Sequence, residues 1–138
     1  MPVVAAALCD TGPLVALFDP GQSTHRLCRA AFQGFEGRLV TTWPVLTETF
    51  YFLRSRKMRQ KLWDFIDQGG VSLFDLLPEN LPRLASLMEK YADLPMALAD
   101  ASLVVLGERL GLTKIFTLDR RDFRVYRPNH ISSFEIIP

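Results

Sequence analysis

The sequence has no strong excess of charge of either sign. Its 138 residues include 16 Lys and Arg against 15 Asp and Glu, which gives a net charge of +1. A chain with this balance has no general attraction for a polyanion. Any binding of nucleic acid must therefore come from local patches of cationic side chains.

Cysteine and histidine are scarce. The two cysteines, Cys9 and Cys28, are too few for a disulfide scaffold. We expect buried, inert thiols rather than a bridge between them, which favours a cytoplasmic location. The two histidines, His25 and His130, lack the spacing of metal ligands, so the sequence offers no His–Cys cluster for zinc.

The sequence also lacks long apolar runs. No stretch approaches the roughly 18 apolar residues of a membrane span. The run 3–9 lacks a preceding positive segment and stops at Asp10, so we expect a buried strand rather than a signal peptide. With 49% hydrophobic residues and no repeat or linker, residues 1–138 are expected to form a single domain that does not contact a membrane.

Apolar runs and helical patterns alternate along the chain. Strands are expected at 4–10, 38–41, 71–76, 114–118 and 133–137, and helices at 12–18, 24–34, 43–54, 57–68, 78–91 and 96–110. Thr11 is expected to cap the first of these helices. Residues 119–122 either belong to an acidic site or form a solvated turn. The alternation predicts an α/β fold, a three-layer α/β/α sandwich around a mainly parallel sheet.

Four acidic residues lie where segments of this fold begin or end. Asp10 and Asp119 follow apolar runs, while Glu48 and Asp100 lie on predicted helices. Ligands of parallel sheets bind outside the carboxyl ends of the strands, and a carboxylate among apolar neighbours is costly unless it is paired or bound to metal. We expect the four to form one site, although each alone could be a turn, cap or solvated residue.

An oxygen-only ligand set suits Mg²⁺ or Mn²⁺. We expect Asp10, Asp100 and Asp119 to bind the ion and all four acids, Glu48 included, to be catalytic. A divalent ion would orient a water and offset charge in the transition state of phosphodiester hydrolysis.

Four short motifs resemble the PIN-domain ribonucleases, especially the bacterial VapC-type toxins. They are CDTGPLVAL at 9–17, Thr47-Glu48, LADASL at 98–103 and TLDRRDF at 117–123. The resemblance covers nearly the whole chain, in the same order and spacing. It implies the three-layer fold, Mg²⁺ or Mn²⁺, cleavage of RNA, an antitoxin partner and often a homodimer.

Ala97 departs from this pattern, because related sequences often carry Asp there. The position lies one helical turn before Asp100, so the missing acid would weaken the metal site. An alternative hypothesis is therefore a catalytically weakened PIN-like module that binds RNA or protein. A third, an aspartyl-phosphate enzyme, is disfavoured because Gly12 stands where that chemistry commonly uses a second Asp.

Thr11, Thr117 and Asp122 are predicted to be auxiliary residues. A hydroxyl beside a carboxylate can fix its rotamer, and for Thr11 this role competes with helix capping without excluding it. Asp122 either supports the site or pairs with Arg121 or Arg124.

Two further features indicate binding surfaces. Arg120, Arg121 and Arg124 follow Asp119 and are expected to hold RNA phosphates. The cations at 54–61 fit either a phosphate contact or a solvated helix end. The run Phe50–Leu53 cannot face one core, so it forms either a helix buried on several sides or a groove for a partner, where an antitoxin segment would lie.

Overall fold

The computed structural model describes residues 5–138 and has a five-stranded sheet at its centre. The strands are β1 (Ala6–Cys9), β2 (Arg38–Thr42), β3 (Ser72–Phe74), β4 (Lys114–Phe116) and β5 (Glu135–Ile137). Their order is β3-β2-β1-β4-β5, and every neighbouring pair is parallel. The predicted parallel sheet is confirmed, while the expected first residue of β1, Val4, lies outside the described residues.

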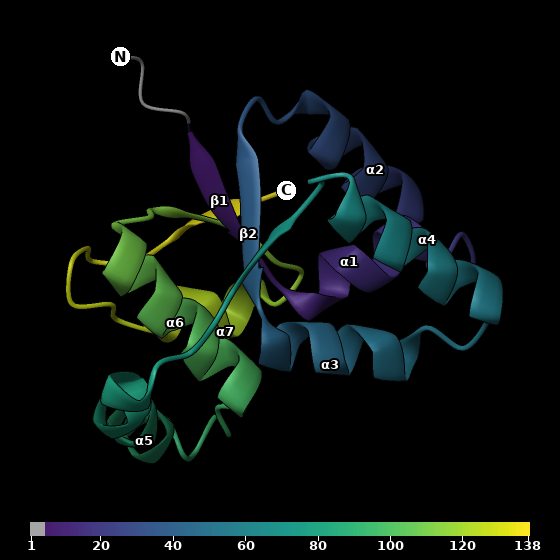
Figure 1. The fold of residues 1–138 in the computed structure, drawn as a ribbon. Helices are drawn as coiled ribbons and strands as arrows, with labels where there is room; N and C mark the ends of the chain where they lie inside the picture. The colour runs from purple at the N-terminus through teal and green to yellow at the C-terminus, as the bar shows by residue number, and fades with distance from the viewer. Residues whose placement is uncertain (1–4) are drawn as a thin grey trace.

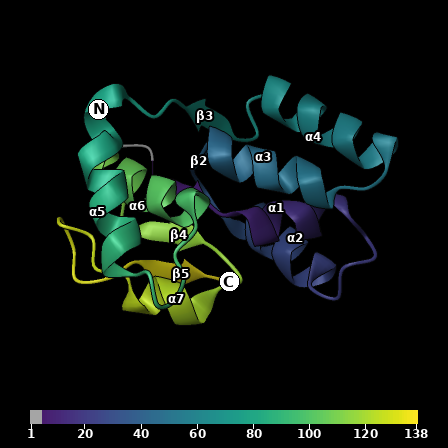
Figure 2. The ribbon, with the colours of Figure 1, turned by 90° about the horizontal axis from the view of Figure 1, so that it is seen from below.

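Helices cover both faces of the sheet, as predicted for a three-layer sandwich. They are α1 (Thr11–Phe18), α2 (His25–Gly34), α3 (Trp43–Phe52), α4 (Arg56–Asp67), α5 (Leu81–Lys90), α6 (Leu98–Leu110) and α7 (Arg120–Val125), with a short 3₁₀ helix at Pro78–Asn80. Figure 1 shows α5 and α6 on one side of the sheet and α1, α2 and α4 on the other. Figure 2 shows α3 lying between α1 and α4. Within residues 5–138, no helix combines the length and apolar character needed to cross a membrane.

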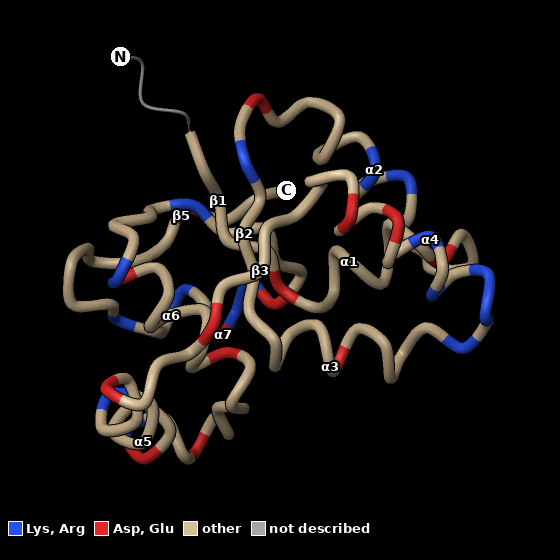
Figure 3. The backbone as a smooth tube through the Cα atoms, viewed as in Figure 1, with Lys and Arg blue, Asp and Glu red and all other residues tan. Residues whose placement is uncertain are grey.

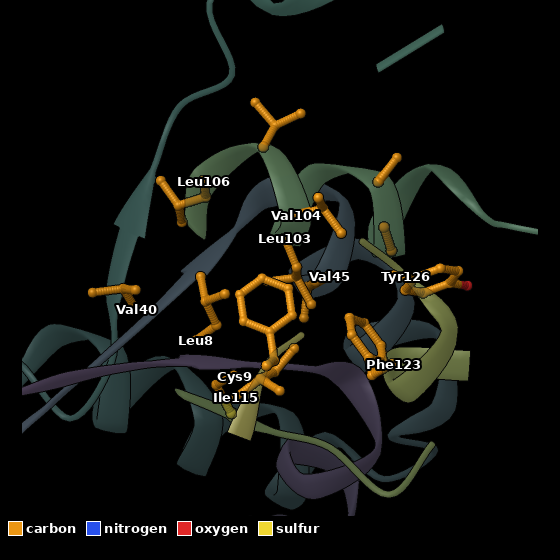
Figure 4. Packing of buried hydrophobic residues seen from close by; sticks show 14 of the residues in the cluster. Leu8, Cys9, Val40, Val45, Leu103, Val104, Leu106, Ile115, Phe123 and Tyr126 are labelled. Carbon is orange, nitrogen blue, oxygen red and sulfur yellow. The ribbon is translucent and has the colours of Figure 1, made fainter. Parts of the chain in front are cut away.

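Burial on both faces explains the continuous apolar run of β1. Leu8 and Cys9 are fully buried, and Figure 4 shows Leu8 within the cluster that includes Leu103 and Val104 of α6. On the opposite face, Phe116 of β4 stacks on Phe32 of α2 with ring centroids 5.0 Å apart. A strand covered on both sides needs apolar residues at every position, which removes the alternation typical of half-exposed strands.

One local prediction is wrong: Asp10, not Thr11, is the N-cap of α1, since its side chain accepts the N–H of Thr11. Residues 119–122, for which a solvated turn was one alternative, instead begin α7, where the Asp119 side chain accepts the N–H of Asp122 at 3.2 Å. A helix of six residues is shorter than the window in which helical periodicity is visible.

The remaining elements differ from expectation mainly at their ends. The helix expected at 78–91 divides into the 3₁₀ helix and α5, and α6 begins at Leu98 rather than Met96. Gly111 ends α6 with a φ of 67°, a left-handed conformation that favours glycine.

Candidate metal centre

The fold brings all four predicted acids to the carboxyl edge of the sheet. Asp10 follows β1, Asp119 follows β4 by three residues, and α3 and α6 carry Glu48 and Asp100. The charges of Asp10, Asp119 and Glu48 all raise the pKa of Asp100, so the four carboxylates interact. A cavity of about 860 Å³ opens here, and its lining includes Asp10, Glu48 and Asp100. We call it the acid cavity.

Three of these acids lie at helix N-termini. Asp10 and Asp119 are the N-caps of α1 and α7, and Asp100 is in the first turn of α6. The N-terminus of a helix carries a partial positive charge and free N–H groups, which stabilise a nearby carboxylate. The local sequence thus places these acids where the backbone partly offsets their repulsion.

Asp10 is the most enclosed of the four, with an exposed fraction of 7%. One carboxylate oxygen accepts the N–H of Thr11 at 2.8 Å, and the other accepts the hydroxyl of Thr117 at 2.7 Å. Burial raises its pKa to about 6, because it outweighs these two hydrogen bonds, and the charges of Glu48 and Asp119 add to the rise. A cation would favour the ionised form.

Asp100 is held by a residue that the sequence did not single out. The buried Tyr126 donates its hydroxyl to Oδ2 of Asp100 at 2.9 Å. Figure 4 shows Tyr126 at the edge of the core with its hydroxyl directed away from the aliphatic cluster. Burial, followed by the charge of Asp10, raises the pKa of Asp100 to about 7 despite this hydrogen bond. The spacing of Phe123 and Tyr126 would have marked one helical face, had α7 been predicted.

The two threonines predicted as auxiliary residues both contact carboxylates. Thr11 donates to Oε1 of Glu48 at 3.0 Å, and Thr117 donates to Asp10 while accepting the N–H of Asp119 at 3.0 Å. Together with Tyr126, they give Asp10, Glu48 and Asp100 one hydroxyl donor each. These donors fix the rotamers of the acids without adding charge.

Asp100, Asp119 and Asp122 are the acids best spaced to share an ion. Each offers one oxygen, and the three oxygens lie within 4.8 Å of one another. This group includes Asp122 in place of the predicted Asp10. Burial and the charge of Asp119 raise the pKa of Asp122, while the charge of Arg121 lowers it. The donor set is oxygen only, so it fits the hard cations Mg²⁺ and Mn²⁺ rather than zinc.

Cationic side chains come from two segments of the chain. Arg54, in the α3–α4 connection, lines the acid cavity together with Phe52 and Met58. Arg120 and its neighbours on α7 are next to Asp119 in sequence, but the Arg120 guanidinium donates to the carbonyl of Pro138. Figure 3 shows basic segments along α4 and at α7.

Ala97 lies in a neighbouring part of the site. It is the N-cap of α6, where it offers no side-chain hydrogen bond to the helix. It lines a second cavity of about 400 Å³ together with Glu48 and Trp43, and is not among the described residues that line the acid cavity. Its missing carboxylate therefore leaves the four predicted acids in place.

Comparison with known proteins identifies relatives of nearly the whole chain. The family model described as the PIN domain matches residues 7–128. The chain is 27% identical to Ribonuclease VapC26 of Mycobacterium tuberculosis over 142 residues, covering 95% of this chain and 99% of that protein.

Solved structures share the fold. The crystal structure of VapC20 from Mycobacterium tuberculosis, described as a sarcin-ricin loop cleaving toxin, has a TM-score of 0.74 and 15% identity, over 83% of this chain and 91% of that chain. A toxin–antitoxin complex from Klebsiella pneumoniae has a TM-score of 0.63 and 20% identity, over 85% and 89%.

The raised pKa values predict that the protein without divalent cations loses stability as pH rises. For Asp10 and Asp100 the pKa in the folded protein exceeds the usual 3.8. The stability that each group contributes is therefore fully present below about pH 4. It is lost as pH rises through about 6 for Asp10 and about 7 for Asp100. For Asp10 alone the loss is on the order of 3 kcal/mol. Thermal unfolding in EDTA should show a falling Tm from about pH 5 to 8, and Mg²⁺ should raise Tm more at pH 8. A flat Tm would contradict this.

Removing the Tyr126 hydroxyl should disturb Asp100 alone. Tyr126→Phe is expected to raise the pKa of Asp100 further, because the hydrogen bond favours the ionised form. It should also weaken Mn²⁺ binding about 10-fold. Carboxyl NMR titration and Mn²⁺ electron paramagnetic resonance measure the two effects.

Tyr91→Phe is the matched control for this experiment. The Tyr91 ring packs edge-on against Tyr126 with centroids 5.0 Å apart, but its hydroxyl accepts the N–H of Arg127 and contacts no acid. If both variants lose the same Mn²⁺ affinity, the loss comes from disturbed packing of the two rings and not from the hydrogen bond between Tyr126 and Asp100.

Proposed function

The chain belongs to the PIN domain family, and on this basis we propose that it is a metal-dependent endoribonuclease that hydrolyses RNA phosphodiester bonds as the toxin of a toxin–antitoxin pair. The convergence of Asp10, Glu48, Asp100 and Asp119 at the carboxyl edge of the sheet, where their charges interact, carries the proposal. The similarity to a ribonuclease along 95% of the chain supports it. The alternative, a catalytically weakened binding module, is not favoured, because all four acids are in place.

Asp100, Asp119 and Asp122 would hold a Mg²⁺ or Mn²⁺ ion, with Asp10 close enough to interact through its charge. Such an ion supplies Lewis-acid stabilisation of the charge that develops on the phosphate. The mutual repulsion of the carboxylates then becomes the source of affinity for the cation, because binding relieves it.

The other residues of the chain orient and activate the reactants. Glu48 faces the acid cavity with Oε1 held by Thr11, so it can accept a proton from an attacking water. Thr117 and the N–H of Thr11 hold both oxygens of Asp10, which fixes the direction of its charge. Hydrogen-bonded carboxylates need little reorganisation during the reaction, which is how preorganised groups lower a barrier.

Cationic residues must hold the RNA, because the acids repel its phosphates. Arg54 is placed for this role, since it lines the acid cavity. Arg120, Arg121 and Arg124 extend the proposed phosphate track along α7.

The end of α3 is the proposed docking surface for the antitoxin. Leu53 is buried and Phe50 packs on Trp63, but Tyr51 is 82% exposed and Phe52 is 52% exposed. The expectation of a helix buried on several sides is therefore wrong for these two residues. Phe52 also lines the acid cavity, so a peptide that covers Tyr51 and Phe52 can extend a basic side chain to the carboxylates.

The proposed homodimer has a separate apolar surface available. Leu77, Leu81 and Leu110 are exposed, Leu81 by 69%, on or near α5 and α6. The proposal includes that two copies of the chain pair as a homodimer and that the protein is cytoplasmic.

Replacing an acid without changing its size should abolish cleavage. Asp10→Asn is expected to lower the rate of RNA cleavage on the order of 100-fold or more, the scale found when one preorganised electrostatic group is lost. The measurement is cleavage of total RNA with Mg²⁺ or Mn²⁺, and with EDTA. Asp93→Asn, at an exposed position outside the site, is the control. Full activity of the Asp10→Asn protein would refute the site.

Truncating Tyr51 should weaken the antitoxin complex without affecting the fold. Tyr51→Ala is expected to lower affinity for the antitoxin encoded beside this chain by about 10-fold or more, as for an aromatic anchor of an interface. Calorimetric titration measures this, and Leu81→Ala is the control because Leu81 is exposed on α5 instead. A loss of affinity in Leu81→Ala but not in Tyr51→Ala would place the antitoxin elsewhere.

A further inference from the structure

The second cavity shares the side chain of Glu48 with the acid cavity. It has a volume of about 400 Å³, and its lining consists of Trp43, Pro44, Thr47, Glu48, Ala97, Leu98 and Ala99. This volume falls within the range of about 300–1,000 Å³ that small-molecule sites occupy. Because Glu48 lines both cavities, the two lie next to each other at this side chain.

The indole of Trp43 is the largest side chain of this cavity, and it is fixed in place. Its Nε1–H donates to Asp75 at 2.8 Å, which ties the start of α3 to the segment after β3. The side chain is nevertheless 48% exposed. A tryptophan that is immobilised at one edge and open over its surface is suited to stacking by a planar ring.

The two polar side chains of the cavity, Thr47 and Glu48, disfavour a bound phosphate. Glu48 brings a carboxylate, and the Thr47 hydroxyl donates to the carbonyl of Trp43, which leaves its lone pairs to accept. Acceptors of this kind repel a phosphate but bind the amino and imino N–H groups of a nucleobase. The remaining lining is apolar, and Ala97 adds no charge.

From this combination we propose that the second cavity is a nucleobase subsite, in which one base of the RNA stacks on Trp43 while its N–H edge faces Glu48 and Thr47. The subsite rests on the proposed ribonuclease function, because it takes a base of the same strand that crosses the acid cavity. It assigns Ala97 a role: the position that departs from the family pattern keeps the base site free of a second carboxylate. Stacking on aromatic rings is a general mode of binding single-stranded nucleic acid.

The chain contains only two tryptophans, which allows a direct test. Trp63 is exposed to the same extent as Trp43, 48%, but lies on α4. In the Trp63→Phe protein all tryptophan fluorescence comes from Trp43, and in the Trp43→Phe protein it comes from Trp63. The probe is a 2′-O-methyl RNA of mixed sequence and about eight nucleotides, a length within the range of single-stranded sites. Fluorescence anisotropy of a labelled copy reports its binding independently.

The expected result is saturable quenching of Trp43 fluorescence at the oligonucleotide concentrations that raise the anisotropy, with no quenching of Trp63. Trp43→Leu should weaken binding roughly 5- to 160-fold, the range that base–aromatic stacking spans. Ala97→Asp should weaken binding more than Ala97→Asn, since the two side chains match in size and differ in charge.

Two outcomes would overturn the subsite alone. One is binding of the oligonucleotide with unchanged Trp43 fluorescence. The other is a blue shift of Trp43 emission that grows with protein concentration in the absence of RNA, which would show that a second copy of the chain covers the ring. If the oligonucleotide does not bind at all, the proposed ribonuclease function fails, and the subsite fails with it.

Discussion

The repulsion among carboxylates at one edge of a parallel sheet is the constraint on which this structure depends. Burial and neighbouring charges raise the pKa of both Asp10 and Asp100, so the folded chain holds these groups at a cost. The cost is limited by neutral donors, since Thr11, Thr117 and Tyr126 each give a hydroxyl to one acid. Neutral donors leave the net negative charge intact. The centre therefore keeps its attraction for a cation, which a set of arginine partners would have cancelled.

Helix N-termini make the second contribution to this balance. The first turns of α1, α6 and α7 meet at the site, and each contains or is capped by one of the acids. Capping thus has two consequences at once, because Asp10 and Asp119, which cap α1 and α7, are also members of the acidic site. For this reason a change at Asp10 or Asp119 affects both local stability and the chemistry of the site.

The site combines two chemically different regions around Glu48. The acid cavity suits a cation and the phosphate bound to it, whereas the Trp43 cavity is uncharged apart from Glu48 itself. On the other side, Phe52 and Arg54 connect the acid cavity to the exposed end of α3. The proposed substrate and the proposed antitoxin would therefore reach the same carboxylates and share Arg54, so occupancy by one can limit access by the other.

The sequence by itself determined the parallel α/β architecture and placed Asp10 and Asp119 at strand ends, because continuous apolar runs and the residues that end them are local signals. Glu48 and Asp100 were singled out by their resemblance to family motifs on predicted helices. The sequence also indicated that Thr11 and Thr117 would support carboxylates. It did not reveal α7, since six residues are too few for a periodic pattern, and so Tyr126 remained an unremarkable aromatic residue. Only the tertiary structure decided that Tyr126 reaches Asp100 across 26 positions, that Asp122 joins Asp100 and Asp119, and that Ala97 borders a cavity with Trp43. These are contacts between elements distant in sequence, and their geometry follows from packing rather than from any local preference.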